Sequence, residues 1–110
     1  MGKSKIETYL GFCLRAKKLL LGTDNVENAK RNVYLLMADE SLSDNAFKIL
    51  IKAQEKFACP LLKCSSGFIG ECLHRYGVKA VAVQDKNLAE AIMENVSQSK
   101  EVKLYSGGNN

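Results

Sequence analysis

The sequence has few of the features that mark disordered, fibrous or membrane-spanning chains. Its 110 residues include one proline and eight glycines, too few for a disordered or collagen-like chain. No apolar run approaches the roughly 20 residues that a membrane-spanning helix needs. Glu7, Thr8 and Arg15 interrupt the apolar stretch after the first lysines, so we expect no signal peptide. Ile6 stands where a myristoylation signal requires Ser or Thr. We therefore expect a cytoplasmic protein with no membrane partner.

The motifs of common enzymes and metal sites are also missing. There is no P-loop, no G-x-G-x-x-G after a strand and no H-E-x-x-H. The possible thiol and imidazole ligands are Cys13, Cys59, Cys64, Cys72 and His74, and they contain no C-x-x-C pair. Asp39, Glu40 and Asp85 follow expected strands, but solvated loops and helix caps account for them. We expect no enzymatic activity, no cofactor, no metal and four reduced thiols.

The charge is uneven along the chain. The net charge is +4, and residues 1–31 hold seven Lys or Arg against three Asp or Glu. Positive and negative residues nearly balance in the remaining segments. A local basic surface is compatible with a nucleic-acid partner.

The apolar spacing alternates between strand-like and helix-like segments. Four short apolar runs, residues 19–21, 33–38, 61–64 and 78–83, are typical of strands. Helical spacing between and beside them indicates helices that begin near Ile6, Thr23, Ser43, the turn at Gly67 and Asn87. This alternation predicts one α/β domain over residues 1–105, a small sheet with helices on both faces. We expect residues 106–110 to form a flexible tail.

Capping residues predict the helix boundaries. Asp24 and Glu27 fit a capping box for a helix that ends near Arg31 and Asn32. Asn87 and Glu90 indicate a cap for the last helix, and Gly77 is typical of a residue that ends the helix before it.

Two strand-to-helix turns are candidate binding sites. In the first, Lys17 and Lys18 precede an apolar run, and Gly22, Thr23, Asp24 and Asn25 then open a helix. Such an end attracts phosphate, and Asn or Asp side chains can contact base edges. An ordinary polar helix cap after a solvated helix end is the alternative.

The second turn contains Ser65, Ser66, Gly67 and Gly70, with a GXXG spacing between the glycines. Ligands usually lie at the carboxyl ends of strands, and GXXG loops clamp nucleic-acid backbones in KH domains. An ordinary capped helix with Ile69 in the core explains the same residues.

Several segments taken in order resemble a known family. The residues are Leu10-Gly11, Arg15-Ala16, Lys18-Leu19 leading to Gly22, the strand closing at Asp39, Cys59-Pro60, Gly70 and Ala82-Val83-Gln84-Asp85. From about Ile6 to Ile92 the chain resembles the L-seven-Ae/L-thirty-e ribosomal protein family, and most closely its small bacterial YlxQ-type members. The resemblance implies a three-layer α/β/α sandwich around a small, about four-stranded mixed sheet. It also implies binding to kink-turn or similar internal-loop RNA.

The resemblance also implies where RNA would bind. In the family the start of the second helix contacts tandem G·A pairs, and a loop before the fourth helix covers an extruded nucleotide. Asp24, Asn25 and Asn28 stand where the family typically has Asn, Glu and Lys. With the basic residues added, the expected RNA-binding set is Lys17, Lys18, Gly22, Thr23, Asp24, Asn25, Asn28, Lys30, Arg31, Cys64, Ser65, Ser66 and Gly67. Arg75 and Lys79 are further candidate phosphate contacts.

These observations predict a monomeric, non-enzymatic RNA-binding protein. Structured RNA is the expected partner, as ribosomal RNA or a kink-turn element, together with ribosomal proteins. The alternatives are a protein–protein adaptor on the same fold without specific RNA binding, and a small-molecule or nucleotide-binding enzyme.

Overall fold

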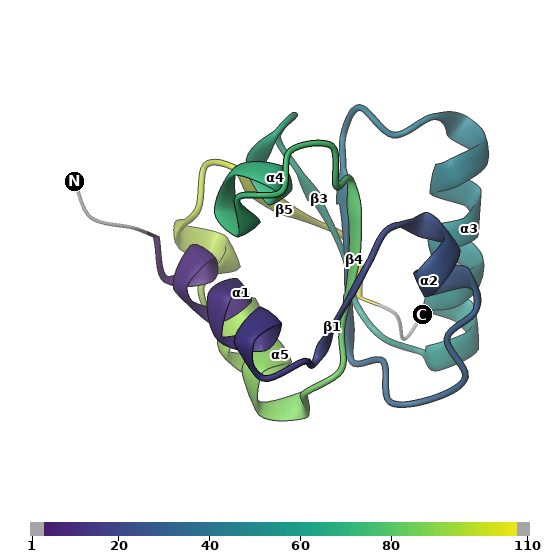
Figure 1. Ribbon diagram of the computed structural model, residues 1–110, viewed down its shortest axis with the longest axis horizontal. Helices are drawn as coiled ribbons and strands as arrows, with labels where there is room; N and C mark the ends of the chain where they lie inside the picture. Colours follow the sequence, from purple (N-terminus) through teal and green to yellow (C-terminus); the bar gives the residue numbers. More distant parts are fainter. Residues whose placement is uncertain (1–3, 108–110) are drawn as a thin grey trace.

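A mixed sheet runs through the middle of the molecule, and helices cover both of its faces (Figure 1). The computed structural model describes residues 4–107. The strands are β1 (Leu19–Leu21), β2 (Leu35–Asp39), β3 (Leu61–Cys64), β4 (Ala80–Val83) and β5 (Val102–Ser106). The helices are α1 (Lys5–Arg15), α2 (Thr23–Glu27), α3 (Asp44–Phe57), α4 (Phe68–Leu73), α5 (Lys86–Glu94) and a 3-10 turn η1 (Val96–Gln98).

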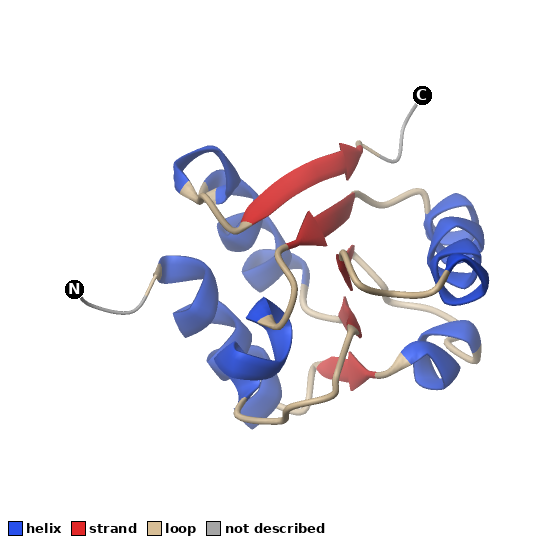
Figure 2. Cartoon of the chain, turned by 90° about the horizontal axis from the view of Figure 1, so that it is seen from above, coloured by secondary structure: helices blue, strands red, loops and turns tan. Residues whose placement is uncertain are grey.

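The strand order is β1-β4-β2-β3-β5, with β2 and β3 parallel and the other pairs antiparallel. The carboxyl ends of β1, β2 and β3 therefore lie beside the amino ends of β4 and β5. We call this row of strand ends edge A; the name does not refer to the outer strands β1 and β5. Edge B is the opposite edge, where β1, β2 and β3 begin. β1 and β5 are the two outer strands (Figure 2).

The two faces of the sheet bury separate apolar clusters, because successive strand residues point to opposite faces. Leu35 and Met37 of β2 pack with α1, α4 and α5, whereas Leu36 and Ala38 pack with α2 and α3. All residues of β2 are buried, as expected for a central strand covered on both faces. Each large apolar side chain buried in this way stabilises the fold by about 1.5–3 kcal/mol.

The expected α/β class and mixed sheet are confirmed, but the sheet has five strands and not about four. The sequence analysis missed β5 because only Val102 of this strand is fully buried, and Lys103, Leu104 and Tyr105 are exposed. Ser106, which we assigned to the tail, is the last residue of β5. Residues 1–3 of the expected domain and 108–110 of the expected tail lie outside the described residues.

Three predicted helix boundaries are wrong. α2 begins at Thr23 and ends at Glu27 without a side-chain cap, so the capping box between Asp24 and Glu27 does not form. The cap of α5 is Asp85, whose carboxylate accepts a hydrogen bond from the Leu88 N–H at 2.9 Å, and not Asn87. α4 ends at Leu73, followed by His74 in the left-handed conformation, four residues before the glycine expected to end it.

The other caps follow the sequence. Ser43 caps α3 by accepting a hydrogen bond from the Ala46 N–H, and α3 ends just before Cys59 and Pro60. Among the helices within residues 4–107, none combines the length and apolarity that a membrane span requires.

Candidate functional site

The turn between β1 and α2 lies at edge A and is tied to β4. Gly22 has φ 92°, a value that favours glycine, and its N–H donates to the Ala80 carbonyl at 2.8 Å. The tight turn leaves Asp24 and Asn25 exposed on the first turn of α2. The Asn25 side-chain amide donates to the Leu21 carbonyl at 2.7 Å. This bond holds the side chain against the end of β1, and the residue as a whole remains exposed.

The expected basic residues lie at edge B. The Lys18 carbonyl accepts a hydrogen bond from the Gln84 N–H at 2.8 Å, and the Gln84 side chain donates to the Arg31 carbonyl at 3.5 Å. These bonds bring the end of α1 and the segment after α2 together, and Lys17, Lys18, Lys30 and Arg31 are all exposed. Lys18 is four residues from Gly22, about 13 Å along an extended strand.

The chain from Lys17 to Arg31 therefore runs from edge B to edge A and back. It carries its cations at edge B and its polar helix start at edge A. Asn28, the C-cap of α2, is exposed between the two groups. We call this outer side of the sheet, residues 17–31, the β1–α2 surface.

The loop between α4 and β4, residues 74–79, adjoins the β1–α2 surface at edge A, because Gly22 bonds the first residue of β4. Tyr76 is 78% exposed, and Arg75 and Lys79 are exposed beside it. Gly70 of α4 supports this loop: a Cβ at that position would lie 3.1 Å from the Arg75 carbonyl oxygen and 3.2 Å from the Tyr76 Cα. The backbone of the loop is thus packed against α4, and its Arg75, Tyr76 and Lys79 side chains are exposed.

The sequence analysis missed Tyr76. The available signal was a tyrosine between Arg75 and Gly77 in a short helix-to-strand connection, a kind of segment that lies at the protein surface. Aromatic side chains in such positions can stack on unpaired bases.

The second loop expected to bind RNA, residues 65–67, also lies at edge A, but its N–H groups already donate hydrogen bonds within the protein. The Gly67 N–H donates to the Asp39 carboxylate at 2.7 Å, and the Ser66 N–H donates to the Glu40 carboxylate at 3.2 Å. The Ser65 N–H donates to the Glu101 carbonyl at 2.7 Å. Because these N–H groups are taken and two carboxylates adjoin them, the loop is a poor site for phosphate.

Cys64 is the one expected contact that lies inside the protein. It is 1% exposed and belongs to the apolar cluster under α1 and α4. The expectation that it touches RNA is therefore corrected, because the side chain of the last β3 residue points into the core.

The two turns expected to bind RNA, at residues 22–25 and 65–67, are also far apart. β4 and β2 lie between β1 and β3 in the sheet. Three strand spacings of about 4.8 Å separate the two turns by about 14 Å. The Gly22–Ala80 bond joins the turn before α2 to the strand that follows residues 74–79, and the Lys79 carbonyl accepts a hydrogen bond from the Asp39 N–H at 2.8 Å.

Asp39 is a buried carboxylate that joins the segments at edge A by hydrogen bonds. It is 2% exposed, and its carboxylate accepts bonds from the Ser41 N–H, the Ser41 hydroxyl and the Gly67 N–H. Burial raises the pKa of Asp39, but these hydrogen bonds and the charge of Lys79 outweigh it and hold the pKa below its ordinary value. The carboxylate is therefore ionised at neutral pH and structural in role.

The four thiols are free and buried. Burial raises the pKa of Cys13 and of Cys59 to about 11 and that of Cys72 to about 12, so these thiols are protonated and unreactive at neutral pH. Within residues 4–107, no group of three or more His, Cys, Asp or Glu side chains is placed to hold a metal ion.

Comparison with known proteins shows similarity at the level of the fold. No protein-family model matches the sequence, and no curated protein matches it. Among solved structures, a Bacillus halodurans protein described as having unknown function superposes with a TM-score of 0.76 at 19% identity. The match covers 84% of this chain and 96% of the other. At this identity the similarity concerns the fold alone.

Proposed function

We propose that the protein is a non-enzymatic RNA-binding protein that uses the β1–α2 surface and residues 74–79. The observation that carries the proposal is the hydrogen bond between Gly22 and Ala80, which ties the turn before α2 to β4 directly after the loop that carries an exposed tyrosine and two exposed cations. In this proposal the two sequence-remote segments act together in binding RNA.

The chemistry of this surface suits RNA with an internal loop. Lys17, Lys18, Lys30 and Arg31 at edge B supply phosphate contacts. Asp24 and Asn25 at edge A offer hydrogen-bonding groups to base edges, and Tyr76 offers a ring on which an unpaired base can stack. A duplex along the β1–α2 surface would meet the cations, while its irregular end would meet edge A.

The proposal includes the resemblance to the L-seven-Ae/L-thirty-e family, with its three-layer α/β/α sandwich and its kink-turn target. It differs from the family's pattern in one respect: residues 74–79, and not residues 65–67, form the second RNA-contacting segment, and residues 65–67 make no phosphate contact. A cytoplasmic, ribosome-associated monomer is part of the same proposal.

The test is a titration with a kink-turn RNA and a plain duplex of equal length at several salt concentrations. Wild type should bind the kink-turn RNA more tightly, with an affinity that falls steeply as salt rises. The double variant Lys17→Ala/Lys18→Ala should weaken binding to both RNAs and flatten the salt slope by about 2.

The matched control is Lys100→Ala/Lys103→Ala, which removes the same charge at the opposite end of the sheet. It should leave affinity and slope near those of wild type. Equal effects of the two double variants would contradict the proposed surface. A protein that binds neither RNA at low salt would be an adaptor on this fold.

A further inference from the structure

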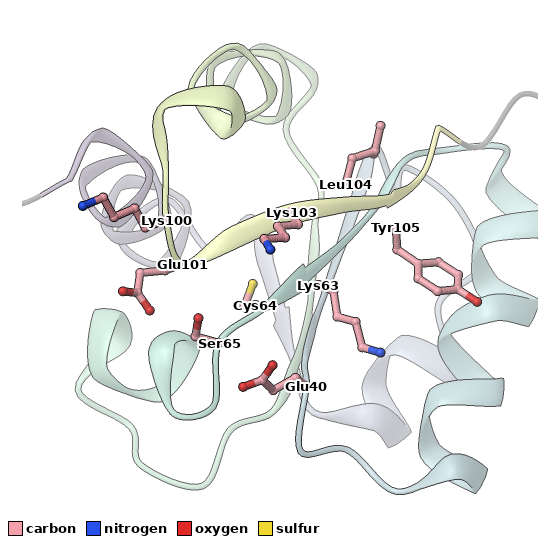
Figure 3. Close-up of a pocket in the computed structure, with 9 residues that line it drawn as sticks. All are labelled: Glu40, Lys63, Cys64, Ser65, Lys100, Glu101, Lys103, Leu104 and Tyr105. Atoms are coloured by element: carbon pink, nitrogen blue, oxygen red, sulfur yellow. The ribbon is translucent and has the colours of Figure 1, made fainter.

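β5, the outer strand at the other end of the sheet, has an unusual pair of lysines. Lys63 of β3 and Lys103 of β5 are register partners, so their side chains share the face of the sheet toward α3 (Figure 3). Like charges directly opposite in a sheet repel. Within residues 4–107 no carboxylate forms an ion pair with either lysine, although such a partner would relieve the repulsion.

Aromatic rings hold one of these lysines in place. Phe47 of α3 and Tyr105 of β5 make an edge-to-face contact at 5.0 Å. The Lys63 ammonium lies 5.0 Å from the Phe47 ring centre and 5.8 Å from the Tyr105 ring centre. The two rings therefore fix the position of the Lys63 ammonium group. Lys63 and Lys103 both remain exposed to solvent.

A groove of about 340 Å³ follows this end of the molecule. Lys63, Lys100, Lys103, Leu104 and Tyr105 line it together with Glu40, Cys64, Ser65 and Glu101 (Figure 3). The lining holds three lysines, Lys63, Lys100 and Lys103, and two carboxylates, Glu40 and Glu101, so its net formal charge is positive.

The backbone of β5 also has an open side. Because the Ser65 N–H bonds the Glu101 carbonyl, the antiparallel alternation makes Lys63 and Lys103 a hydrogen-bonded pair. The N–H and C=O of Val102 and Leu104 then point away from β3. β5 has no other strand beside it in the described sheet.

The exposed side chains of β5 alternate in character. Leu104, 51% exposed, points to one face of the sheet, and Lys103 and Tyr105, the latter 49% exposed, point to the other. An extended peptide beside β5 would pair with the free backbone groups, and its side chains would alternate to the same two faces.

We propose that β5 docks an extended acidic segment of a partner protein by strand addition. Alternate carboxylates of that segment would meet Lys103 and Lys63, and the intervening apolar residues would pack on Leu104. The lysines favour this partner over a second copy of the chain, because pairing two β5 strands would bring more lysines together. A nucleic acid would use the lysines and Tyr105 but neither the free backbone groups nor Leu104.

The probe is a blocked, fluorescent octapeptide of alternating Glu and Val, with a Lys/Val peptide for comparison, followed by fluorescence anisotropy. Wild type should bind the Glu peptide and not the Lys peptide. Lys103→Glu should weaken the Glu peptide about fivefold or more and improve binding of the Lys peptide. Lys17→Ala/Lys18→Ala, at the far end of the sheet, is the control and should bind the Glu peptide as wild type does.

Leu104→Pro tests the backbone. It removes an N–H that faces solvent and retains the β3–β5 bonds, and edge strands tolerate proline in this position. We expect it to abolish peptide binding while circular dichroism stays native. Native-like binding by a folded Leu104→Pro protein would overturn strand addition.

Other outcomes also decide the question. Equal affinity for the Glu and Lys peptides, or binding of neither, would overturn the proposal. A mass that doubles for wild type but not for Leu104→Pro in light scattering would assign β5 to a second copy. A short single-stranded RNA that binds wild type and Leu104→Pro equally but fails to bind Lys103→Glu would assign the lysines to nucleic acid.

Discussion

The Asn25 side chain has one role in the fold and another in the proposed binding site. Its amide nitrogen donates a hydrogen bond to the Leu21 carbonyl, and the residue is exposed next to the exposed Asp24. The intramolecular bond restricts the rotamer, so the side chain is held in one orientation before a ligand arrives. We therefore expect Asn25 to contribute more to RNA specificity than to the electrostatic attraction of RNA.

The variant Asn25→Ala should lose about 1–3 kcal/mol of binding free energy against a kink-turn RNA, by analogy with base-edge contacts in duplex readout. Its affinity for a plain duplex should change little. Isothermal titration with both RNAs measures this, and Asn87→Ala, an exposed asparagine on α5, is the control. Equal losses against the two RNAs would remove Asn25 from base recognition.

Asp39 acts on stability through its ionised form. The pKa of Asp39 is lowered in the folded state, so its contribution is present above the unfolded pKa, about 3.9, and is lost as pH falls through the lower folded value. Asp39→Asn should lower the free energy of unfolding by about 1–3 kcal/mol at neutral pH. The variant should also show a smaller fall of stability below pH 4.

Urea unfolding at several pH values checks this prediction. Glu40→Gln is the matched control, since Glu40 is exposed and accepts one bond from the same loop. Its loss should be below about 1 kcal/mol. Identical losses for the two variants would mean that burial of Asp39 adds nothing to its role.

At the scale of elements, α4 sets the position of the loop that carries Tyr76. The Cβ of an alanine at position 70 would press on backbone atoms of Arg75 and Tyr76 at 3.1 and 3.2 Å. Backbone atoms yield less easily than the ends of flexible side chains, so the loop must shift.

Gly70→Ala should therefore destabilise the fold by about 1–3 kcal/mol. It should also weaken RNA binding at temperatures where the variant is folded. Thermal unfolding and the same RNA titration measure both effects, with Gly11→Ala on α1 as the control, whose nearest contact is the Arg15 guanidinium at 3.4 Å. A destabilised variant with wild-type RNA affinity would separate this loop from the site.

Elements with a continuous apolar run could be predicted from the sequence, and those held by long-range pairing could not. β3 was predicted with its observed bounds, Leu61–Cys64, because buried strands need apolar residues at nearly every position. β5 is an outer strand that pairs only with β3, so its exposed residues gave no periodic signal. α2 was predicted too long because Val26 and Ala29 are both buried although the helix ends at Glu27.

The candidate site shows the same division. Residues 22–25 were found from local turn chemistry, and they lie exposed or half-buried at edge A. The neighbour that completes the surface, residues 74–79, depends on the pairing of β1 with β4. No local pattern indicates that Asp39 and Glu40 accept hydrogen bonds from the N–H groups of the loop at residues 65–67, because that contact joins the ends of β2 and β3.

At the scale of the whole molecule, the two outer strands carry different surfaces. The β1 end combines cations, a polar helix start and an exposed tyrosine, and the β5 end combines paired lysines with an open strand edge. The sheet separates them by β4, β2 and β3, so variants at one end provide controls for the other. Both proposals can therefore succeed or fail independently.

The most direct test of the central claim is a map of backbone amide chemical shifts in the full chain as a kink-turn RNA is added. The account predicts the largest changes in residues 17–31 and 74–79, small changes at residues 65–67 and none in β5. Changes centred on β5 or on α5, or a spectrum unaffected by saturating RNA at low salt, would contradict it.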